Sequence, residues 1–496
     1  MNIFKDKFSE IKKASEPLYK SPKSVQETIE ILKISESGIF EVADGKYSKT
    51  YRFSDVNYAT RSEDEQESFF QRYCKCLNSF DCTFKITVNN KNKDMDVLRN
   101  EVMLKYRNDG FDKMRESYNR IIEEKILEGR QGIEQERYLT ITIDRKNFEE
   151  AKAQFATIEA SMFRSFAELG SKLTPLTGNE RLKILHDYYR LGREDEFNFD
   201  IRQGRITGTD FRNEICNTRI KYHPDYFENE GKVGRVLFIK KYPTYLSDRF
   251  FTELTFLPVH SVTSVDVVPV PKDLTMKMLQ KKYLGIESDI IKQQRTRNRN
   301  NDFSSDISYA TRQKKKDIEE IMNNVRENDE SLYYVSVTMI VMADDRDELQ
   351  SICETVDSIA KGAGCAVDTC MYKQREAVNT TLPIGVRQIE TMRTMLTQSL
   401  AVLMPFNVQE LCDRNGIYYG VNQISKNIIV GNRKKLLNGN GFIFGVSGAG
   451  KSFFSKMEMG SVFLKGEDDV IVIDPMHGAK RSYLKRVGAI FIKLYA

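Results

Sequence analysis

The sequence predicts an α+β region, built as two related lobes, followed by the first part of an α/β domain. Three observations predict this fold class. From residue 24 to about residue 400, strand-like alternation and helix-like spacing follow one another. Two segments of that region resemble each other. After residue 401, an apolar stretch, a glycine-rich turn and a helical stretch follow in the order of a βα unit.

The elements of the α+β region can be placed in order along the chain. "KYSKTYRFSDVNYA" alternates like a strand, "EDEQESFFQRYCKCLNSF" has helical spacing, and "CTFKITVNN" predicts another strand. The two similar segments start at Arg137 and Leu332. Each contains a strand, a turn and an amphipathic helix with acidic residues in its first turn, where the helix dipole favours them. Each also follows a strand and a helical region, so we interpret them as a duplicated half.

A helical, basic insertion is expected at residues 272–330. Its centre, Lys292 to Lys316, has eight basic residues against two acidic ones and few apolar side chains. Two interpretations stay open at this point: an arm that contacts DNA or anionic lipid, or a solvated loop.

Composition limits the class of protein. Of 496 residues, 40% are hydrophobic and 30% charged, and 76 basic residues nearly balance 71 acidic ones, which does not favour nucleic-acid binding by net charge alone. The eight cysteines show no CxxC spacing, which favours reduced thiols and no metal site. No apolar run is long enough to cross a bilayer, and no signal peptide is expected. The start, residues 1–23, reads as a basic arm that could rest on a membrane surface or simply fray.

Residues 445–452, Gly-Val-Ser-Gly-Ala-Gly-Lys-Ser, match the phosphate-loop pattern GxxxxGK[ST] without a mismatch. Glycines let backbone amides approach phosphate, and the next helix directs its positive end at the same anion. Lys451 would reach the β- and γ-phosphates of ATP and act as the catalytic lysine, and the Ser452 hydroxyl would bind Mg²⁺. Phe453 is expected to pack beneath the loop. The expected nucleotide site comprises Gly445, Val446, Ser447, Gly448, Ala449, Gly450, Lys451, Ser452 and Phe453.

The stretch "DDVIVIDP", residues 468–475, predicts a buried strand that ends at Asp474. Asp474 could bind Mg²⁺ through water, or it could simply form an Asp-Pro turn. A helix, "AKRSYLKRVG", and a last strand, "AIFIKLYA", are expected after it.

The C-terminal region resembles a known family. "GIYYGVNQISKNIIVGNRKKLLNGNGFIFGVSGAGKSFFSKMEMG" followed by "DVIVIDP" is similar to the ATPases of conjugative type IV secretion systems, the VirB/TrbE/CagE group of the FtsK–HerA class. The resemblance rests on a hairpin around Gly420, the "NGN" turn, Phe453 after the loop serine, and Lys456 with Glu458 in the next helix. "SKTYRFSDVNYA" and "PIGVRQIETMRTMLTQSLAVLMPF" extend it through most of the chain, and versions from Gram-positive mobile elements resemble it most.

The resemblance implies that residues 401–496 begin a RecA-like phosphate-loop NTPase domain. It implies a cytoplasmic ATPase, peripheral at the inner face of the cell membrane and often hexameric. With ATP and Mg²⁺, such an enzyme energises assembly of a secretion channel or transport of DNA or protein through it. Inner-membrane channel components would be its partners, and DNA is a further candidate partner.

Only 44 residues follow Ser452 in this 496-residue chain. Family members carry the Walker B Asp-Glu, a glutamine motif and a trans-acting arginine beyond that point. The chain is therefore expected to be incomplete, to bind nucleotide weakly and to hydrolyse it barely. Two alternatives stay open: a non-hydrolysing assembly subunit with a remnant site, or a DNA translocase whose basic segment touches DNA.

Overall fold

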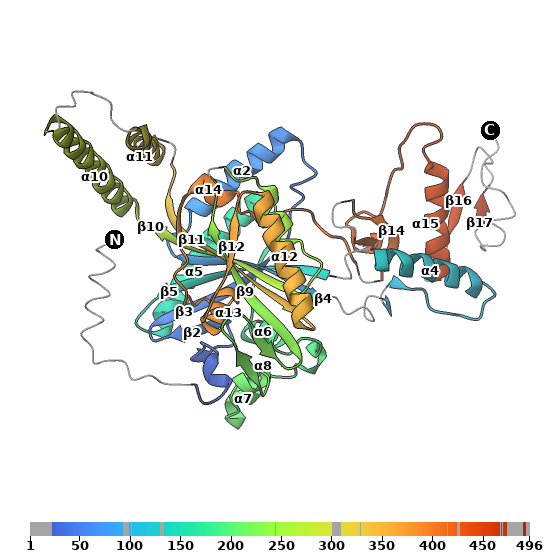
Figure 1. The fold of residues 1–496 in the computed structure, drawn as a ribbon. Helices are drawn as coiled ribbons and strands as arrows, with labels where there is room; N and C mark the ends of the chain where they lie inside the picture. The colour runs from blue at the N-terminus through green and yellow to red at the C-terminus, as the bar shows by residue number, and fades with distance from the viewer. Residues whose placement is uncertain are drawn as a thin grey trace.

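The structure is a computed structural model that describes residues 22–92, 99–100, 102–128, 133–243, 245–299, 309–327, 329–413, 415–423, 427–466, 468, 470–473 and 490–492. It is mixed α and β, and its centre is a large antiparallel sheet covered by helices (Figure 1). Across the described residues, 13 strands join this sheet, with the main order β1-β2-β3-β5-β4-β10-β11-β9-β8-β7. β6, β12 and β13 pair at the sides of this path.

The first half of the sheet is a β-α-β-β-α-β unit. Its elements are β3 (Lys46–Phe53), α2 (Glu63–Asn78), β4 (Thr83–Asn92), β5 (Ile133–Asp144), α5 (Phe148–Leu169) and β6 (Leu173–Pro175). β3 pairs with β5 and β6, and β5 pairs with β4. The strands of the unit therefore lie in the order fourth, first, third, second, as in ferredoxin-like folds.

The second half repeats that arrangement. Its elements are β9 (Lys232–Lys241), α9 (Arg249–Thr255), β10 (Ser261–Val270), β11 (Leu332–Ala343), α12 (Arg346–Gly362) and β12 (Ala366–Thr369). β9 pairs with β11 and β12, and β11 pairs with β10, so the strand order is the same. The helix starts also agree: the side chains of Asn147 and Asp345 cap α5 and α12 by accepting from the amides of Glu150 and Glu348.

The two halves share one sheet and do not form separate lobes. β4 of the first half pairs antiparallel with β10 of the second, from Phe84 opposite Val267 to Asn90 opposite Ser261. Each of these strands would be an open edge in an isolated half. Their pairing removes two edges that could otherwise aggregate.

The remaining elements extend the sheet or cover it. The added strands are β1 (Lys33–Ile34), β2 (Ile39–Ala43), β7 (Ile220–Tyr222), β8 (Phe227–Asn229) and β13 (Arg393–Leu396). The added helices are α6 (Gly178–Tyr189), α7 (Ile201–Thr207), α8 (Arg212–Ile215), α13 (Gln374–Thr381) and α14 (Thr397–Ala401).

Helices cover both faces of the sheet. On one face the side chains of α2, α5, α9 and α12, such as Phe69 and Phe155, share a core with Phe84, Val265 and Val337 of the strands. The other core combines residues of α6, α8 and α13 with strand residues. The helices contribute Leu182, Ile215 and Val378, and the strands contribute residues such as Val262 and Ile340. Strands buried on both faces explain why their apolar residues run almost continuously in β11.

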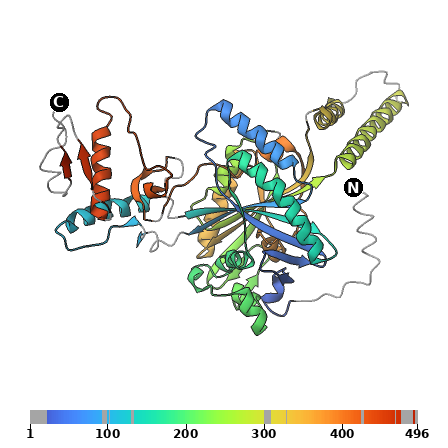
Figure 2. The same cartoon turned by 180° about the vertical axis from the view of Figure 1, so that it is seen from behind.

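Each half carries an insertion between its second and third strands. The first insertion contains α4 (Asp112–Glu128), and the second is a hairpin of α10 (Lys272–Arg299) and α11 (Tyr309–Glu327). The two insertions leave the sheet at opposite ends, which is visible from both sides of the molecule (Figure 1 and Figure 2). The two insertions therefore occupy equivalent positions in the duplicated topology but lie in different surroundings.

A small C-terminal unit follows the sheet and contacts the first insertion. It contains β14 (Ile417–Val421), β15 (Ile428–Gly431), α15 (Lys451–Lys465), β16 (Ile471–Ile473) and β17 (Ile490–Ile492). β14 and β15 form an antiparallel hairpin, and β16 and β17 pair in parallel. Ile122 and Ile126 of α4 share a small core with Ile428 and Val430 of the hairpin. Within the described residues, β16 and β17 form a separate two-stranded parallel sheet.

One strand expected from the sequence is absent from the described C-terminal unit. Residues 441–446, which precede the glycine-rich loop, have no strand pairing. Phe442 and Phe444 are 84% and 88% exposed there, and their rings stack on each other with centroids 5.8 Å apart. A strand needs a neighbour for its backbone hydrogen bonds, and apolar alternation alone does not provide one.

Candidate functional site

The glycine-rich loop takes the backbone shape that its glycines permit. Gly448 has φ +82° and Gly450 has φ +86°, both in the left-handed region that side chains disfavour. A Cβ atom built on either residue would meet nothing within 4 Å. The glycines are therefore needed for conformation and not for space, and the loop leaves room above its backbone.

The side chain of Lys451 folds back over this loop. Its Nζ atom donates to the carbonyl oxygens of Gly445 at 2.7 Å and Val446 at 2.8 Å. The amide of Ala449 donates to the same Val446 oxygen at 3.2 Å, which closes the turn. An ammonium group is thus fixed against the loop, where it would face any anion bound there.

The loop ends at the N-terminus of α15. Gly450 is the N-cap residue and makes no side-chain cap, and the first closing bond runs from the amide of Phe454 to the Gly450 carbonyl oxygen at 2.9 Å. The amides of a first helical turn have no partner inside the helix, and they carry the positive end of the dipole. Backbone amides, dipole and the Lys451 ammonium therefore converge on one small region.

Ser452 and Phe453 are exposed at the start of α15. The expectation that Phe453 packs beneath the loop is wrong, because its side chain is 75% exposed. Phe454 is the aromatic residue that faces inward, with its ring 6.3 Å from that of Tyr419. The exposed Ser452 hydroxyl lies directly after the lysine, which suits a contact with a bound ligand or its metal ion.

Glu458 anchors the body of α15. Its Oε1 atom accepts from the Tyr419 hydroxyl at 2.8 Å and pairs with the Arg433 guanidinium at 2.8 Å. Arg433 Nε also donates to the Tyr419 hydroxyl at 3.0 Å. A Cβ at Gly441 would lie 2.8 Å from the Arg433 guanidinium, so this group also lies against the segment that leads to the loop.

The far end of α15 is held by the first insertion, which sequence reasoning did not connect to the loop. Arg115 is 1% exposed, and its Nε donates to the carbonyl oxygen of Leu464 at 3.0 Å. Its guanidinium also pairs with Asp109 and Asp112. Phe111 packs edge-on against Phe463, with ring centroids 5.2 Å apart. No local pattern marks this contact, because its partners lie 349 residues apart.

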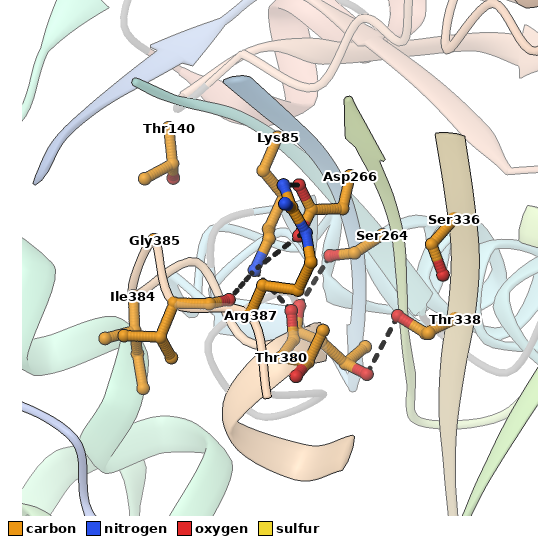
Figure 3. Close-up of polar contacts among 12 residues, drawn as sticks. Lys85, Thr140, Ser264, Asp266, Ser336, Thr338, Thr380, Ile384, Gly385 and Arg387 are labelled. Atoms are coloured by element: carbon orange, nitrogen blue, oxygen red, sulfur yellow. Dashed lines mark hydrogen bonds and ion pairs between the residues drawn. The ribbon is translucent and has the colours of Figure 1, made fainter. Parts of the chain in front are cut away.

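A second concentration of polar groups lies under the middle of the sheet (Figure 3). Lys85 of β4 and Asp266 of β10 are buried, with 3.9 Å between Nζ and Oδ2. Arg387 closes over Asp266 with hydrogen bonds of 2.7 and 3.2 Å. Lys85 also donates to the carbonyl oxygens of Thr380 and Val386. Burial lowers the pKa of Lys85 to about 8, although Asp266 opposes this shift.

This polar layer holds a strap, residues 380–387, that crosses the sheet (Figure 3). Hydroxyl groups of the strands donate to strap carbonyls: Ser48 to Ile384 at 2.6 Å, Thr142 to Gly385 at 3.0 Å, and Ser264 to Thr381. The carbonyl oxygens of the strap therefore accept hydrogen bonds from the hydroxyl donors of the polar layer. We assign it a structural role and not a substrate site.

Asp474, the other expected magnesium ligand, lies outside the described residues. Among the residues that are described, no group of three or more His, Cys, Asp or Glu could hold a metal ion. In the same part of the chain, no helix is long and apolar enough to cross a membrane.

Comparison of the chain with protein-family models and with curated proteins found no match.

Proposed function

We propose that the chain binds ATP at residues 445–452 and represents a conjugative type IV secretion ATPase. The observation that carries the proposal is the geometry of the loop. Two left-handed glycines, the Lys451 ammonium and the N-terminus of α15 converge on one open region. This convergence of cation, amides and dipole is what a polyphosphate requires.

The residues present fit a nucleotide with its magnesium ion. The amides from Gly448 to Ser452 would hold the phosphates, Lys451 would balance their charge, and Ser452 would contribute one oxygen to Mg²⁺. When bound, Mg²⁺·ATP supplies a phosphoanhydride whose hydrolysis can drive mechanical work. To contact the phosphates, the Lys451 ammonium would exchange its two hydrogen bonds to the carbonyl oxygens of Gly445 and Val446 for bonds to phosphate oxygens.

The larger role rests on the sequence resemblance. The "NGN" turn, Phe453 and the Lys456–Glu458 pair resemble the secretion ATPases of the VirB/TrbE/CagE group. The parent protein would act at the cytoplasmic face of the membrane, as an oligomer, with inner-membrane channel components as partners. It would energise channel assembly or substrate transport.

A nucleotide titration of the full chain tests the proposal. Isothermal titration with Mg²⁺·ATP and Mg²⁺·ADP should show binding that Lys451→Ala weakens at least about tenfold, since a charge-assisted contact contributes about 1.5–3 kcal/mol. Lys456→Ala is the matched control, because it removes the same charge from the same helix. Equal binding by both variants would remove the basis of the proposal.

One observation favours a non-hydrolysing assembly subunit as a second candidate. The segment before the loop is unpaired and exposes Phe442 and Phe444, so the loop lacks the rigid strand that normally positions it. That candidate predicts nucleotide binding with no Lys451-dependent release of phosphate. The ATPase predicts such a release from the full-length parent.

A further inference from the structure

The second insertion of the duplicated sheet corresponds in position to the one that docks on the C-terminal unit. Both leave the sheet between the second and third strands of their half. The α4 insertion contacts the C-terminal unit, whereas the α10–α11 hairpin projects from the opposite end of the sheet (Figure 1 and Figure 2). The hairpin therefore presents its helices outward, as an element available for a partner.

The two helices of the hairpin lie side by side in a fixed register. Lys315 of α11 pairs with Glu287 of α10 at 3.0 Å, and its ammonium lies 5.1 Å from the centre of the Tyr283 ring. This pairing places the turn of α10 around Glu287 beside the second turn of α11, and the last turns of α10 extend past the start of α11. Cations that are distant in sequence therefore gather at the distal half of the hairpin.

Basic side chains outnumber acidic ones in the distal half of the hairpin, and α10 carries further exposed lysines nearer the sheet, at Lys277, Lys281 and Lys282. Lys292 and Arg295 on α10, and Arg312, Lys314 and Lys316 on α11, are exposed in the distal half. The acidic residues of α11 follow nearer the sheet, at Asp317, Glu319, Glu320 and Glu327. Asp289, in the distal part of α10, lies 3.9 Å from Lys292, and Glu287 is used by Lys315. The distal half is therefore a positive rod.

The composition of this rod decides between two anionic partners. A helix that rests on a membrane needs apolar side chains beside its cations. On α11, residues 311–316, Thr-Arg-Gln-Lys-Lys-Lys, have none, and neither do they have the aromatic rings on which single-stranded bases stack. On α10, Ile291 is 47% exposed beside Lys292. The α11 cations, which lack both features, suit the regularly spaced phosphates of a double helix.

We propose that the distal half of the α10–α11 hairpin binds the sugar–phosphate backbone of duplex DNA without reading its sequence. Arg312, Lys314 and Lys316 supply the contacts from α11, and Arg295 supplies one from α10. This site is separate from the loop at residues 445–452, and it does not depend on nucleotide binding there. Its affinity must fall steeply with salt, because each phosphate contact releases counterions.

Fluorescence anisotropy of the full chain with labelled duplex DNA of about 30 base pairs, over a range of salt concentrations, tests the proposal. The triple variant R312Q/K314Q/K316Q should bind at least about tenfold more weakly at low salt. Its slope of log affinity against log salt should be lower by about 2–3, from about 0.9 per contact. The matched control, K75Q/K152Q/K172Q, removes three exposed charges from the body of the protein and should change the affinity less than about twofold.

Several outcomes would overturn the proposal. No binding by the wild-type chain, an equal loss in both triple variants, or an unchanged salt slope would each contradict it. A flotation assay with vesicles of phosphatidylglycerol and phosphatidylcholine tests the alternative partner, an anionic membrane. If the R312Q/K314Q/K316Q variant loses vesicle binding and keeps DNA binding, the hairpin is a membrane contact instead. Circular dichroism confirms folding of each variant, and these three side chains are exposed, so a folded variant is expected.

Discussion

The Nε atom of Arg115 donates a hydrogen bond of 3.0 Å to the carbonyl oxygen of Leu464, in the last turn of the helix that carries the candidate phosphate loop. A cation at a helix C-terminus is stabilised by the dipole, and it satisfies a carbonyl that has no partner inside the helix. Asp109 and Asp112 pair with the same guanidinium. The first insertion of the sheet therefore fixes the end of α15 opposite to the loop.

Arg115→Met should destabilise the C-terminal unit. The change removes the guanidinium from two carboxylates, which keep only their backbone amide donors, and from the Leu464 carbonyl oxygen. We expect a loss of about 2–3 kcal/mol in the opening free energy of the unit. Hydrogen exchange at amides of α15 and β15 measures this opening. Arg120→Met is the control, since Arg120 is exposed on the same helix α4 and its loss should have little effect. Equal exchange in both variants would contradict a role for the Arg115 contacts.

The sequence predicted those elements whose signals are local. The alternation in "KYSKTYRF" and the acidic first turns of α5 and α12 depend on neighbouring residues, and β3 and both helices formed where expected. The resemblance of the segments that start at Arg137 and Leu332 corresponds to equivalent strands and helices, β5–α5 and β11–α12. The position of α15 directly after the glycine-rich loop was predicted for the same reason.

What could not be predicted depends on contacts between distant residues. The strap at residues 380–387 has no local sequence signal, because its donors lie on strands such as β3 and β10. The role of Arg115 depends on a partner 349 residues away. The prediction of a strand before the loop was wrong although its local signal was present. Phe442 and Phe444 have the alternation of a strand, but the described unit provides no neighbouring strand to pair with them.

Glu458→Gln should lower stability and leave nucleotide affinity almost unchanged. Glu458 holds Arg433 and Tyr419 against the body of α15, so we expect its charge to support packing and not phosphate binding. Arg433 is 40% exposed, so we expect a loss of only about 1 kcal/mol. Thermal unfolding and an ATP titration of the same variant, beside Lys456→Gln, separate the two effects. A tenfold loss of affinity without destabilisation would place Glu458 in the binding site instead.

His260 should make the protein sensitive to acid. Its side chain is buried, and neither ring nitrogen has a hydrogen-bond partner among the described residues. Burial lowers its pKa from 6.5 to about 4, Asp187 opposes this shift, and Lys232 adds to it. Between pH 6.5 and about pH 4, the His260 side chain is protonated in the unfolded chain and neutral in the folded chain. The stability is therefore complete above pH 6.5 and is lost as the pH falls toward 4, by up to about 3 kcal/mol.

The histidine variants test this sign. Thermal unfolding of His260→Leu between pH 6.5 and pH 4 should be less dependent on pH than that of the wild type. His223→Leu removes a partly exposed histidine that pairs with Glu228 at the surface, and it should keep the steep dependence. The same slope in the wild type and in His260→Leu would show that other groups control the acid response.

Lys85→Met should loosen the strap and the junction between the two halves of the sheet. Lys85 lies on β4 and contacts Asp266 of β10 and the strap carbonyls of Thr380 and Val386. Methionine fills a similar volume, but it removes the ammonium donor from the strap carbonyl oxygens of Thr380 and Val386, at a cost of about 3 kcal/mol. Arg387 still pairs with Asp266, which limits the loss.

Hydrogen exchange at the amides of α13 and β10 measures this loosening directly. Lys91→Met is the matched control, because Lys91 lies on the same strand and its ion pair with Glu136 is partly exposed, so its loss should cost less than about 1 kcal/mol. Faster exchange confined to α13 would mean that Lys85 holds only the strap. Faster exchange in both α13 and β10 is the expected result, since one ammonium group joins the strap to the strand pair that makes two halves into one sheet.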